Sequence, residues 1–511
     1  MNFKYFLTTN VTYAVSKQEI CVIFSIFVIA FIFRFYDLGE VALNNDEAIY
    51  AGQAASLANF SEFQEQFSIF RAHPLLLQFL MSISFYFFGI NEFTARIVPM
   101  LLSCNIIVIS YFIAKFLYNQ RTAIISSIIL SLLPYHISIS KQALVDVSMS
   151  FFFVLSLLLI VLYYRKNAFF LLYGIGISTG LCFLSKETGI ISLVISILSL
   201  ILIDKKIRIK NIIVLTLSFA VVTSPYWISF LTLDEARKSL LEYIDWQSSR
   251  PANHGNLYYI NIISSEILGY VLSLLLVIAY LHILVNKRNW KFSNVILPFF
   301  WIIIPLFFYQ MISVKGYHFL FSITPFLVIF AISFLSSNRI NRISRNEILL
   351  IAIIPLTLIS NNYIINEYFL FISHTPVLGS ESLFHMRDAA MWIKENTPEN
   401  STILTLYTHM SNIIKFYAQR DSIAVQSNNN PSYQKIENLD IQILAKKINY
   451  IVYEKIQIEN GKFLENKATD LENYVKKYDG IPVYVNYQNY TNVENNKFVS
   501  IPAIIIYEFS K

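Results

Sequence analysis

Two adjacent carboxylates, Asp46 and Glu47, follow the first long apolar segment of the chain, which runs from Ile20 to Phe33. Charge close to a lipid bilayer is costly, so a carboxylate pair at this depth indicates a functional site. A carboxylate in such a place can accept a proton from a hydroxyl group as a general base. The simpler alternative is structural, because an acidic residue just before an apolar helix commonly caps its first turn.

Further polar side chains stand at the ends of later apolar segments, and most can donate hydrogen bonds or carry positive charge. They are His73, Arg96, Asp146, Lys186, Arg250, His254, Lys315, Tyr317 and His318. Fixed cations of this kind can stabilise a departing anion. Structural alternatives remain open: Asp146 can begin a helix, Lys315 can extend along apolar surface to water, and Lys186 can pair with Glu187 on the surface.

The composition identifies the class of protein. The 511 residues are 55% hydrophobic and only 14% charged, with a net charge of +6, whereas soluble domains carry roughly 25% charged residues. The mean hydropathy is +0.53. The sequence therefore predicts a polytopic α-helical membrane protein. The three cysteines lie in apolar stretches and indicate neither disulfides nor a thiolate metal site.

A membrane-spanning helix needs roughly 20 apolar residues, and about eleven segments meet this condition. They lie near residues 18–35, 96–117, 122–140, 148–164, 168–184, 188–203, 211–230, 257–284, 293–311, 317–336 and 347–366. The stretch 74–90 is apolar but short and interrupted by polar residues. If it lies at the interface without crossing, the Lys and Arg clusters of the short loops all fall on one side, as the positive-inside rule requires. We therefore expect a cytoplasmic N-terminus and an outer loop over residues 36–95.

After about Ser373 the composition becomes polar. A helical pattern over Met386–Lys394 is followed by short runs rich in strand-forming residues, beginning at Thr402 and ending at Tyr507. This pattern predicts a small α/β domain outside the membrane. The domain division is thus a transmembrane domain over 1–372 and an extracytoplasmic α/β domain over 373–511.

Several motifs of the membrane region, taken in order, resemble one family. They are Asp46–Tyr50, His73–Leu76, Phe88–Arg96, Lys141–Asp146, Ser185–Gly189, Pro225–Trp227 and Val314–Tyr317. Together they resemble the motifs of the GT-C glycosyltransferases of the dolichyl-phosphate-mannose–protein mannosyltransferase type (glycosyltransferase family 39). They are also similar to the motifs of the aminoarabinose transferases that modify lipid A. His73 departs from the pattern, because the family usually has a lysine there.

The resemblance implies an inverting transfer of a sugar from a polyprenyl (dolichyl or undecaprenyl) phosphate donor to an acceptor outside the membrane. Asp46 is then the general base, Glu47 orients it or caps the next helix, and Asp146 serves catalysis or the acceptor site. Lys315 is the main phosphate contact. His73, Arg96, Lys186, Arg250, His254, Tyr317 and His318 are the further substrate-binding candidates. No Gly-rich phosphate loop is present, which agrees with a donor that needs no nucleotide.

Three questions stay open at this stage. The acceptor is expected to be a protein Ser/Thr hydroxyl, but a lipid phosphate or lipid-linked glycan would also fit, and a transporter or flippase is a third alternative. No cofactor is expected, although the resemblance leaves a divalent metal possible, because the oligosaccharyl and aminoarabinose transferase branches bind one. The lack of a targeting segment favours a prokaryotic plasma membrane, with membrane lipids and no nucleic acid as partners.

Overall fold

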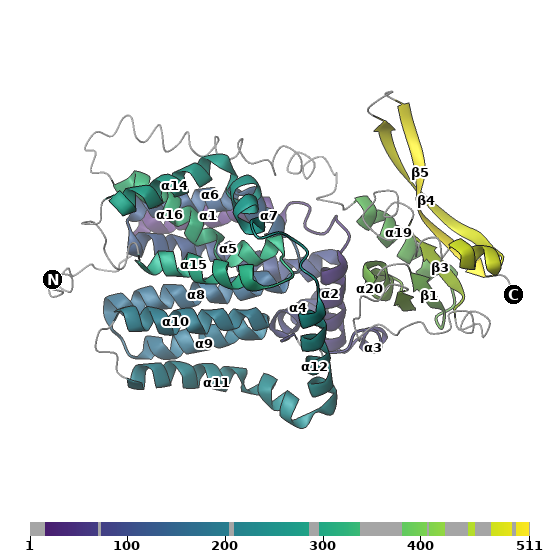
Figure 1. Cartoon of the computed structure of the whole chain (residues 1–511), viewed down its shortest axis with the longest axis horizontal. Helices are drawn as coiled ribbons and strands as arrows, with labels where there is room; N and C mark the ends of the chain where they lie inside the picture. Colours follow the sequence, from purple (N-terminus) through teal and green to yellow (C-terminus); the bar gives the residue numbers. More distant parts are fainter. Residues whose placement is uncertain are drawn as a thin grey trace.

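The computed structural model describes residues 16–69, 73–203, 209–285, 296–337, 381–405, 408–424, 448–454, 472–492 and 497–509. Within these ranges the chain forms a bundle of apolar helices and a separate α/β domain beyond one end of it (Figure 1). The expected segment 347–366 and the expected domain boundary at 372/373 lie outside the described residues.

The bundle consists mainly of long apolar helices that run side by side (Figure 1). Their bounds are α1 Lys17–Phe35, α5 Glu92–Leu117, α6 Gln120–Leu132, α7 Pro134–Ser140, α8 Val145–Lys166, α9 Phe170–Ser185, α10 Ile190–Ile203, α11 Ile209–Thr232, α14 Gly269–Val285, α15 Leu297–Met311 and α16 Thr324–Ser337. Four helices in the described residues, α1, α5, α8 and α11, are long and apolar enough to cross a membrane. The number rises to six if each of two bent helix pairs is one span.

Short elements connect these helices at the end of the bundle that faces the α/β domain. Their bounds are α2 Asn45–Leu57, α3 Ser61–Gln64, α4 Leu76–Phe88, η2 Glu187–Gly189, α12 Asp234–Ser249, α13 Tyr258–Ile262, η3 Ile263–Ile267 and η6 Tyr317–Ser322. The apolar stretch expected at the interface is α4, whose 13 residues extend about 20 Å. This is shorter than the roughly 30 Å hydrocarbon core. The helix ends at Gly89, whose φ of +76° only glycine adopts easily.

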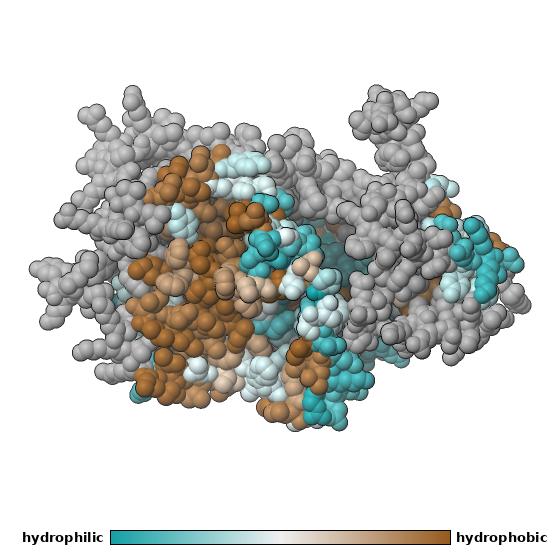
Figure 2. All heavy atoms as spheres, in the orientation of Figure 1, coloured by the Kyte–Doolittle hydropathy of each residue, from teal (hydrophilic) through white to brown (hydrophobic). Residues whose placement is uncertain are grey.

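The opposite end of the bundle carries basic residues. Lys115 forms an ion pair with Glu19, Arg165 donates to the carbonyl of Phe116, and Lys210 lies over the ring of Phe169. This end also holds the start of α1, far from the α/β domain (Figure 1). The surface between the two ends is largely apolar, whereas the coloured part of the α/β domain and part of α12 are mainly hydrophilic in this view (Figure 2).

The α/β domain confirms the expected sheet and adds elements that the sequence pattern did not reveal, α20 and β2. Its elements are α19 Glu381–Asn396, β1 Thr402–Thr405, α20 Thr408–Tyr417, β2 Asp421–Ala424, β3 Tyr450–Tyr453, β4 Gly480–Asn492 and β5 Lys497–Phe509. The strand order is β2-β1-β3-β5-β4. Strands β2, β1 and β3 are parallel, and β5 pairs antiparallel with β3 and β4.

The α/β domain shares a hydrophobic core with α2, α3 and α4. On α2 the buried positions are small, including Ala48, Ala51 and Ala55, and they belong to the same cluster as Met410 and Ile413 of α20. Small residues let helices approach closely, so α20 and α2 make direct contact. Helix α2, which carries Asp46 and Glu47 in its first turn, is therefore packed between the bundle and the α/β domain.

Candidate functional site

Glu47 is locked into the fold by Arg96. Its two carboxylate oxygens accept hydrogen bonds from Nε and Nη2 of Arg96, both at 2.8 Å, and the two side chains are 2% and 4% exposed. The remaining guanidinium contacts go to backbone carbonyls, those of Leu38, Val41 and Ala42. All three guanidinium nitrogens are thus engaged. This geometry favours a structural role for Arg96 over the expected phosphate contact.

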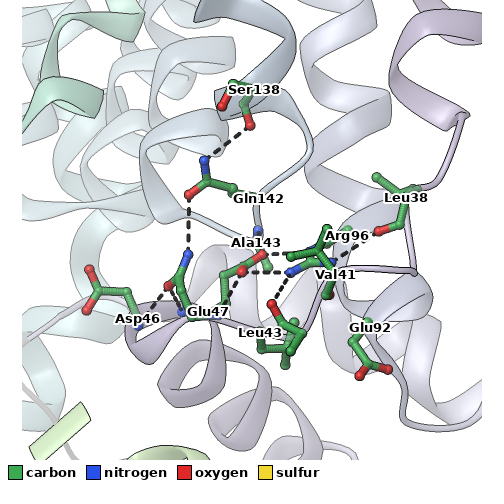
Figure 3. A network of polar contacts seen from close by, with 12 residues as sticks. Leu38, Val41, Leu43, Asp46, Glu47, Glu92, Arg96, Ser138, Gln142 and Ala143 are labelled. Carbon is green, nitrogen blue, oxygen red and sulfur yellow. Dashed lines mark hydrogen bonds and ion pairs between the residues drawn. The ribbon is translucent and has the colours of Figure 1, made fainter. Parts of the chain in front are cut away.

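Glu47 also joins three segments of the chain (Figure 3). Its oxygens accept from the backbone N–H of Asn44 at 3.0 Å and of Ala143 at 2.8 Å. With the Asn44 side chain accepting in return from the N–H groups of Asp46 and Glu47, the start of α2 forms a capping box. Of the two roles expected for Glu47, the geometry shows the cap. The same carboxylate fixes α2 against α5 and against the loop that leads to Asp146.

Asp46 has the opposite environment. Its side chain is directed away from the Glu47–Arg96 pair (Figure 3). Within the described part of the chain its only side-chain hydrogen bond comes from the neighbouring Asn45, whose Nδ2 lies 2.9 Å from Oδ1. The Glu47 carboxylate therefore stabilises the fold, whereas the Asp46 carboxylate remains available for chemistry.

Asp146, at the start of α8, pairs with Lys186 at the end of α9. The Lys186 ammonium donates to both oxygens of Asp146, at 2.9 and 3.1 Å, and both side chains are buried. The Nε2 of His318 lies 3.7 Å from the same carboxylate. Burial lowers the pKa of His318, although Asp146 opposes that change. Asp146 thus holds a lysine and a histidine in place rather than standing free as a base.

His73 lies in a second polar group, around Glu187. The Nδ1 of His73 is 2.9 Å from one Glu187 oxygen, and the hydroxyl of Tyr243 donates to the other at 3.0 Å. Gln247 in turn donates to the Tyr243 hydroxyl at 2.7 Å. The tight turn before α10 requires Gly189, where a Cβ would come within 2.3 Å of the Cys182 carbonyl oxygen. Lys186 and Glu187 therefore do not form the simple surface pair considered above.

Tyr50 connects the two groups electrostatically. Burial, followed by the charges of Asp46, Asp146 and Glu187, raises the pKa of Tyr50 well above its ordinary value. Arg250 and His318 also interact with the charge of Asp46. The three carboxylates and these partners therefore form one site at the end of the bundle. The sequence offered a sign of Tyr50, one turn after Asp46, but none of Tyr243. Its segment was expected to be part of a long outer loop from Leu231 to Asn256, whereas the structure forms α12 there.

Lys315 belongs to the loop beside Arg250 and His254. The side-chain amide of Asn253 bonds both the N–H and the carbonyl of Lys315, at 2.8 and 2.9 Å. The Lys315 ammonium makes one long hydrogen bond in the described residues, 3.5 Å to the His254 carbonyl, although the residue is 6% exposed. A buried cation with so little compensation is suited to bind an anion.

The remaining candidates, Arg250, His254 and Tyr317, each contact an aromatic residue. Arg250 lies over the ring of Trp246, and His254 stacks on Tyr258 with ring centres 3.9 Å apart. The carbonyl of Tyr317 accepts a hydrogen bond from the Tyr135 hydroxyl at 2.7 Å. No group of three or more His, Cys, Asp and Glu side chains suited to a metal occurs in the described ranges.

Comparison with known sequences places part of the chain in context. The family model described as dolichyl-phosphate-mannose-protein mannosyltransferase matches residues 72–228. This segment contains His73, Arg96, Asp146 and Lys186, and it begins after Asp46. An uncharacterised protein of Aquifex aeolicus (strain VF5) is 30% identical over 160 residues, which are 30% of this chain and 32% of that protein. The chain thus matches about a third of that relative.

Solved structures extend the likeness to nearly the whole chain. ArnT from Cupriavidus metallidurans bound to undecaprenyl phosphate has a TM-score of 0.61 at 13% identity, covering 96% of this chain and 98% of ArnT. A second similar structure is an oligosaccharyltransferase from Archaeoglobus fulgidus, tethered with an acceptor peptide containing the NVT sequon. Its TM-score is 0.59 at 14% identity, and the match covers 97% of this chain and 74% of the oligosaccharyltransferase chain. The fold is that of the GT-C membrane glycosyltransferases, which confirms the resemblance seen in the motifs.

Proposed function

We propose that this protein transfers a sugar from a polyprenyl phosphate to an acceptor hydroxyl outside the membrane, with Asp46 as the general base. The observation that carries the proposal is the different environment of the two neighbouring carboxylates, Asp46 and Glu47. Glu47 is bound on both oxygens by Arg96, while Asp46 accepts a single side-chain hydrogen bond within the described ranges, from Asn45, in a site with Lys186, Arg250 and His318. The ArnT structure with undecaprenyl phosphate supports a polyprenyl phosphate as the donor's lipid part.

The reaction follows from the groups present. Asp46 accepts the proton of the acceptor hydroxyl as its oxygen attacks the anomeric carbon. The bond between that carbon and the phosphate oxygen breaks, the configuration inverts, and the polyprenyl phosphate leaves with the electron pair. Lys315, with Arg250 and His254 of the neighbouring loop as further donors, stabilises the developing phosphate charge, and His73 is another candidate donor to the substrate. Asp146 positions Lys186 and His318. The proposal requires no metal. Asp46 takes up the proton of the acceptor hydroxyl, and the cationic side chains offset the negative charge that develops on the leaving phosphate.

The topology belongs to the same proposal. We place about eleven spans in a plasma membrane, the basic end of the bundle and the N-terminus in the cytoplasm, and the α/β domain outside. The bundle's two chemically different ends support this orientation. A protein Ser/Thr hydroxyl is the first acceptor to test. Transfer to a lipid phosphate or lipid-linked glycan is the second candidate, and transport of a lipid-linked sugar is the third.

The test is transfer of radiolabelled sugar from purified polyprenyl phosphate donors to membrane extract, with and without a chelator. Asp46→Asn should lower the rate at least about 100-fold, and Asp234→Asn, which alters a carboxylate whose side chain is 91% exposed, should not. Activity that survives the chelator supports the metal-free mechanism. Undiminished activity of Asp46→Asn would remove the general base and favour an acceptor that is already ionised. The labelled product identifies the acceptor class.

A further inference from the structure

The α/β domain reaches the candidate base through a chain of side-chain amides. The Nδ2 of Asn412, on α20, lies 2.8 Å from Oδ1 of Asn45. The Nδ2 of Asn45 in turn lies 2.9 Å from Oδ1 of Asp46. Two hydrogen bonds thus join a residue 366 positions away in the sequence to the carboxylate that the proposed reaction uses.

We propose that Asn412 is a positioning residue, through which the α/β domain orients the Asp46 carboxylate for proton transfer. The inference rests on the proposed function of Asp46. It gives the α/β domain a part in the reaction that its own sequence, which carries no motif, does not suggest.

The polarity of the chain follows from its last member. An ionised carboxylate only accepts hydrogen bonds, so Asn45 must present its NH2 group to Asp46. The carbonyl oxygen of Asn45 is then left to face Asn412, which must present its own NH2 group. The amide of Asn45 is consequently fixed from both sides. Without Asn412 it would be free to rotate and release Asp46.

Asn412 lies in a buried and packed part of the interface. The residue is 6% exposed, and its helix buries Met410, Ile413 and Ile414 in the core shared with α2. Five residues further on, the Tyr417 hydroxyl accepts from the N–H of Leu43 and donates to Glu92, both at 2.9 Å. Among the described residues, Asn412 and Tyr417 make the polar contacts of α20 beside the start of α2, and the contact of Asn412 continues to the Asp46 carboxylate.

This arrangement offers a matched control. Tyr417→Phe removes the two hydroxyl bonds at the same interface but leaves the amide chain intact. Asn412→Ala removes the chain, and Asn412→Asp reverses it. In Asn412→Asp the new carboxylate can only accept, so the NH2 of Asn45 turns towards it and the Asn45 oxygen faces Asp46.

The experiment measures kcat, KM for the donor and the pH profile of kcat for the full-length protein in nanodiscs. Asn412→Ala should lower kcat about tenfold. It frees the Asn45 amide to turn away from Asp46, and a lost hydrogen bond to a charged group is usually worth about this much. KM should stay within about twofold, and the acidic limb of the profile should move to higher pH. Asn412→Asp should show both effects more strongly. Tyr417→Phe should lower the unfolding temperature without moving the limb, because Tyr50, Arg250 and His318, the titratable groups that interact with Asp46, are unchanged.

The outcomes separate this inference from the proposed function. If Asp46→Asn is inactive but Asn412→Ala keeps the wild-type kcat and profile, the positioning role is overturned while the general base stands. If Asp46→Asn is fully active, both are overturned. A readout without turnover comes from electron cryo-microscopy of Asn412→Ala and Tyr417→Phe. An Asp46 side chain that changes rotamer only in Asn412→Ala supports the inference, and an unchanged rotamer in both variants contradicts it.

Discussion

Lys186 and Glu187 are neighbours in the chain, yet their side chains bind different partners in the site. The Lys186 ammonium lies 2.9 Å from Asp146, whereas Glu187 lies 2.9 Å from His73 and accepts from Tyr243. The extended backbone of Lys186, with φ −159° and ψ 138°, separates the two directions. One dipeptide thus supports two polar groups, one on the bundle side and one towards α12.

The first prediction concerns the buried pair of Asp146 and Lys186. Lys186→Met should destabilise the protein by about 3–5 kcal/mol, because it leaves the Asp146 charge buried without a partner. Adding Asp146→Asn should restore much of that loss, since the uncompensated charge disappears. Thermal unfolding in detergent checks both. If the double variant is as unstable as Lys186→Met alone, the pairing does not explain the cost.

The second prediction separates the two members of the acidic pair. Glu47→Gln should lower stability by about 3–5 kcal/mol, because its NH2 group would face the buried Arg96 guanidinium. Asp46→Asn should change the unfolding temperature little, since its carboxylate supports few contacts, but should abolish transfer. Unfolding curves and initial rates measured on the same preparations decide the matter. Equal stability of the two variants would refute this division.

The third prediction tests the group around His73. Tyr243→Phe removes one hydrogen bond from Glu187, which orients the imidazole. A lost hydrogen bond of this type is worth about 1 kcal/mol, so KM for the donor should rise about fivefold with little change in kcat. Steady-state kinetics with the purified donor measure both constants. A fall in kcat at constant KM would show that the group acts on the chemical step instead.

The fourth prediction concerns pH and the α/β domain. The Nε2 of His409 lies 2.8 Å from the buried Glu454. Burial alone would lower the pKa of His409, but the Glu454 charge and hydrogen bond outweigh it and raise the pKa above 6.5. Protonated His409 therefore favours the folded state. The contribution is complete below about pH 6.5 and is lost as the pH rises through the higher folded value.

This effect is measured by thermal unfolding of wild type and His409→Gln side by side between about pH 5.5 and about pH 9, the range in which histidine titrates. The wild type should lose stability relative to His409→Gln as the pH rises above about 6.5. A difference between the two that is constant across the range would mean that the ion pair does not titrate there.

The sequence by itself determined the class of protein, the series of apolar helices and the presence of strands near the C-terminus, but it did not reveal α12, α20 or β2. Long apolar runs fix membrane helices because unpaired backbone groups cannot be left in lipid, and the basic loops distinguish the two ends. The motif around Asp46 and the charged positions after it pointed to the end of the bundle where the site lies. These signals are local, so they can be read along the chain without knowing what packs against what.

Only the tertiary structure decided which charged residues are consumed by folding. Glu47 and Asp46 are chemically alike and adjacent, and their roles diverge because Arg96 and the N–H of Ala143 approach one and not the other. The same holds for Asn412, whose partner Asn45 comes near only after the α/β domain packs on α2. Such pairings join residues far apart in the chain, and hydrogen bonds and burial that depend on three-dimensional packing leave no periodic trace in a single sequence.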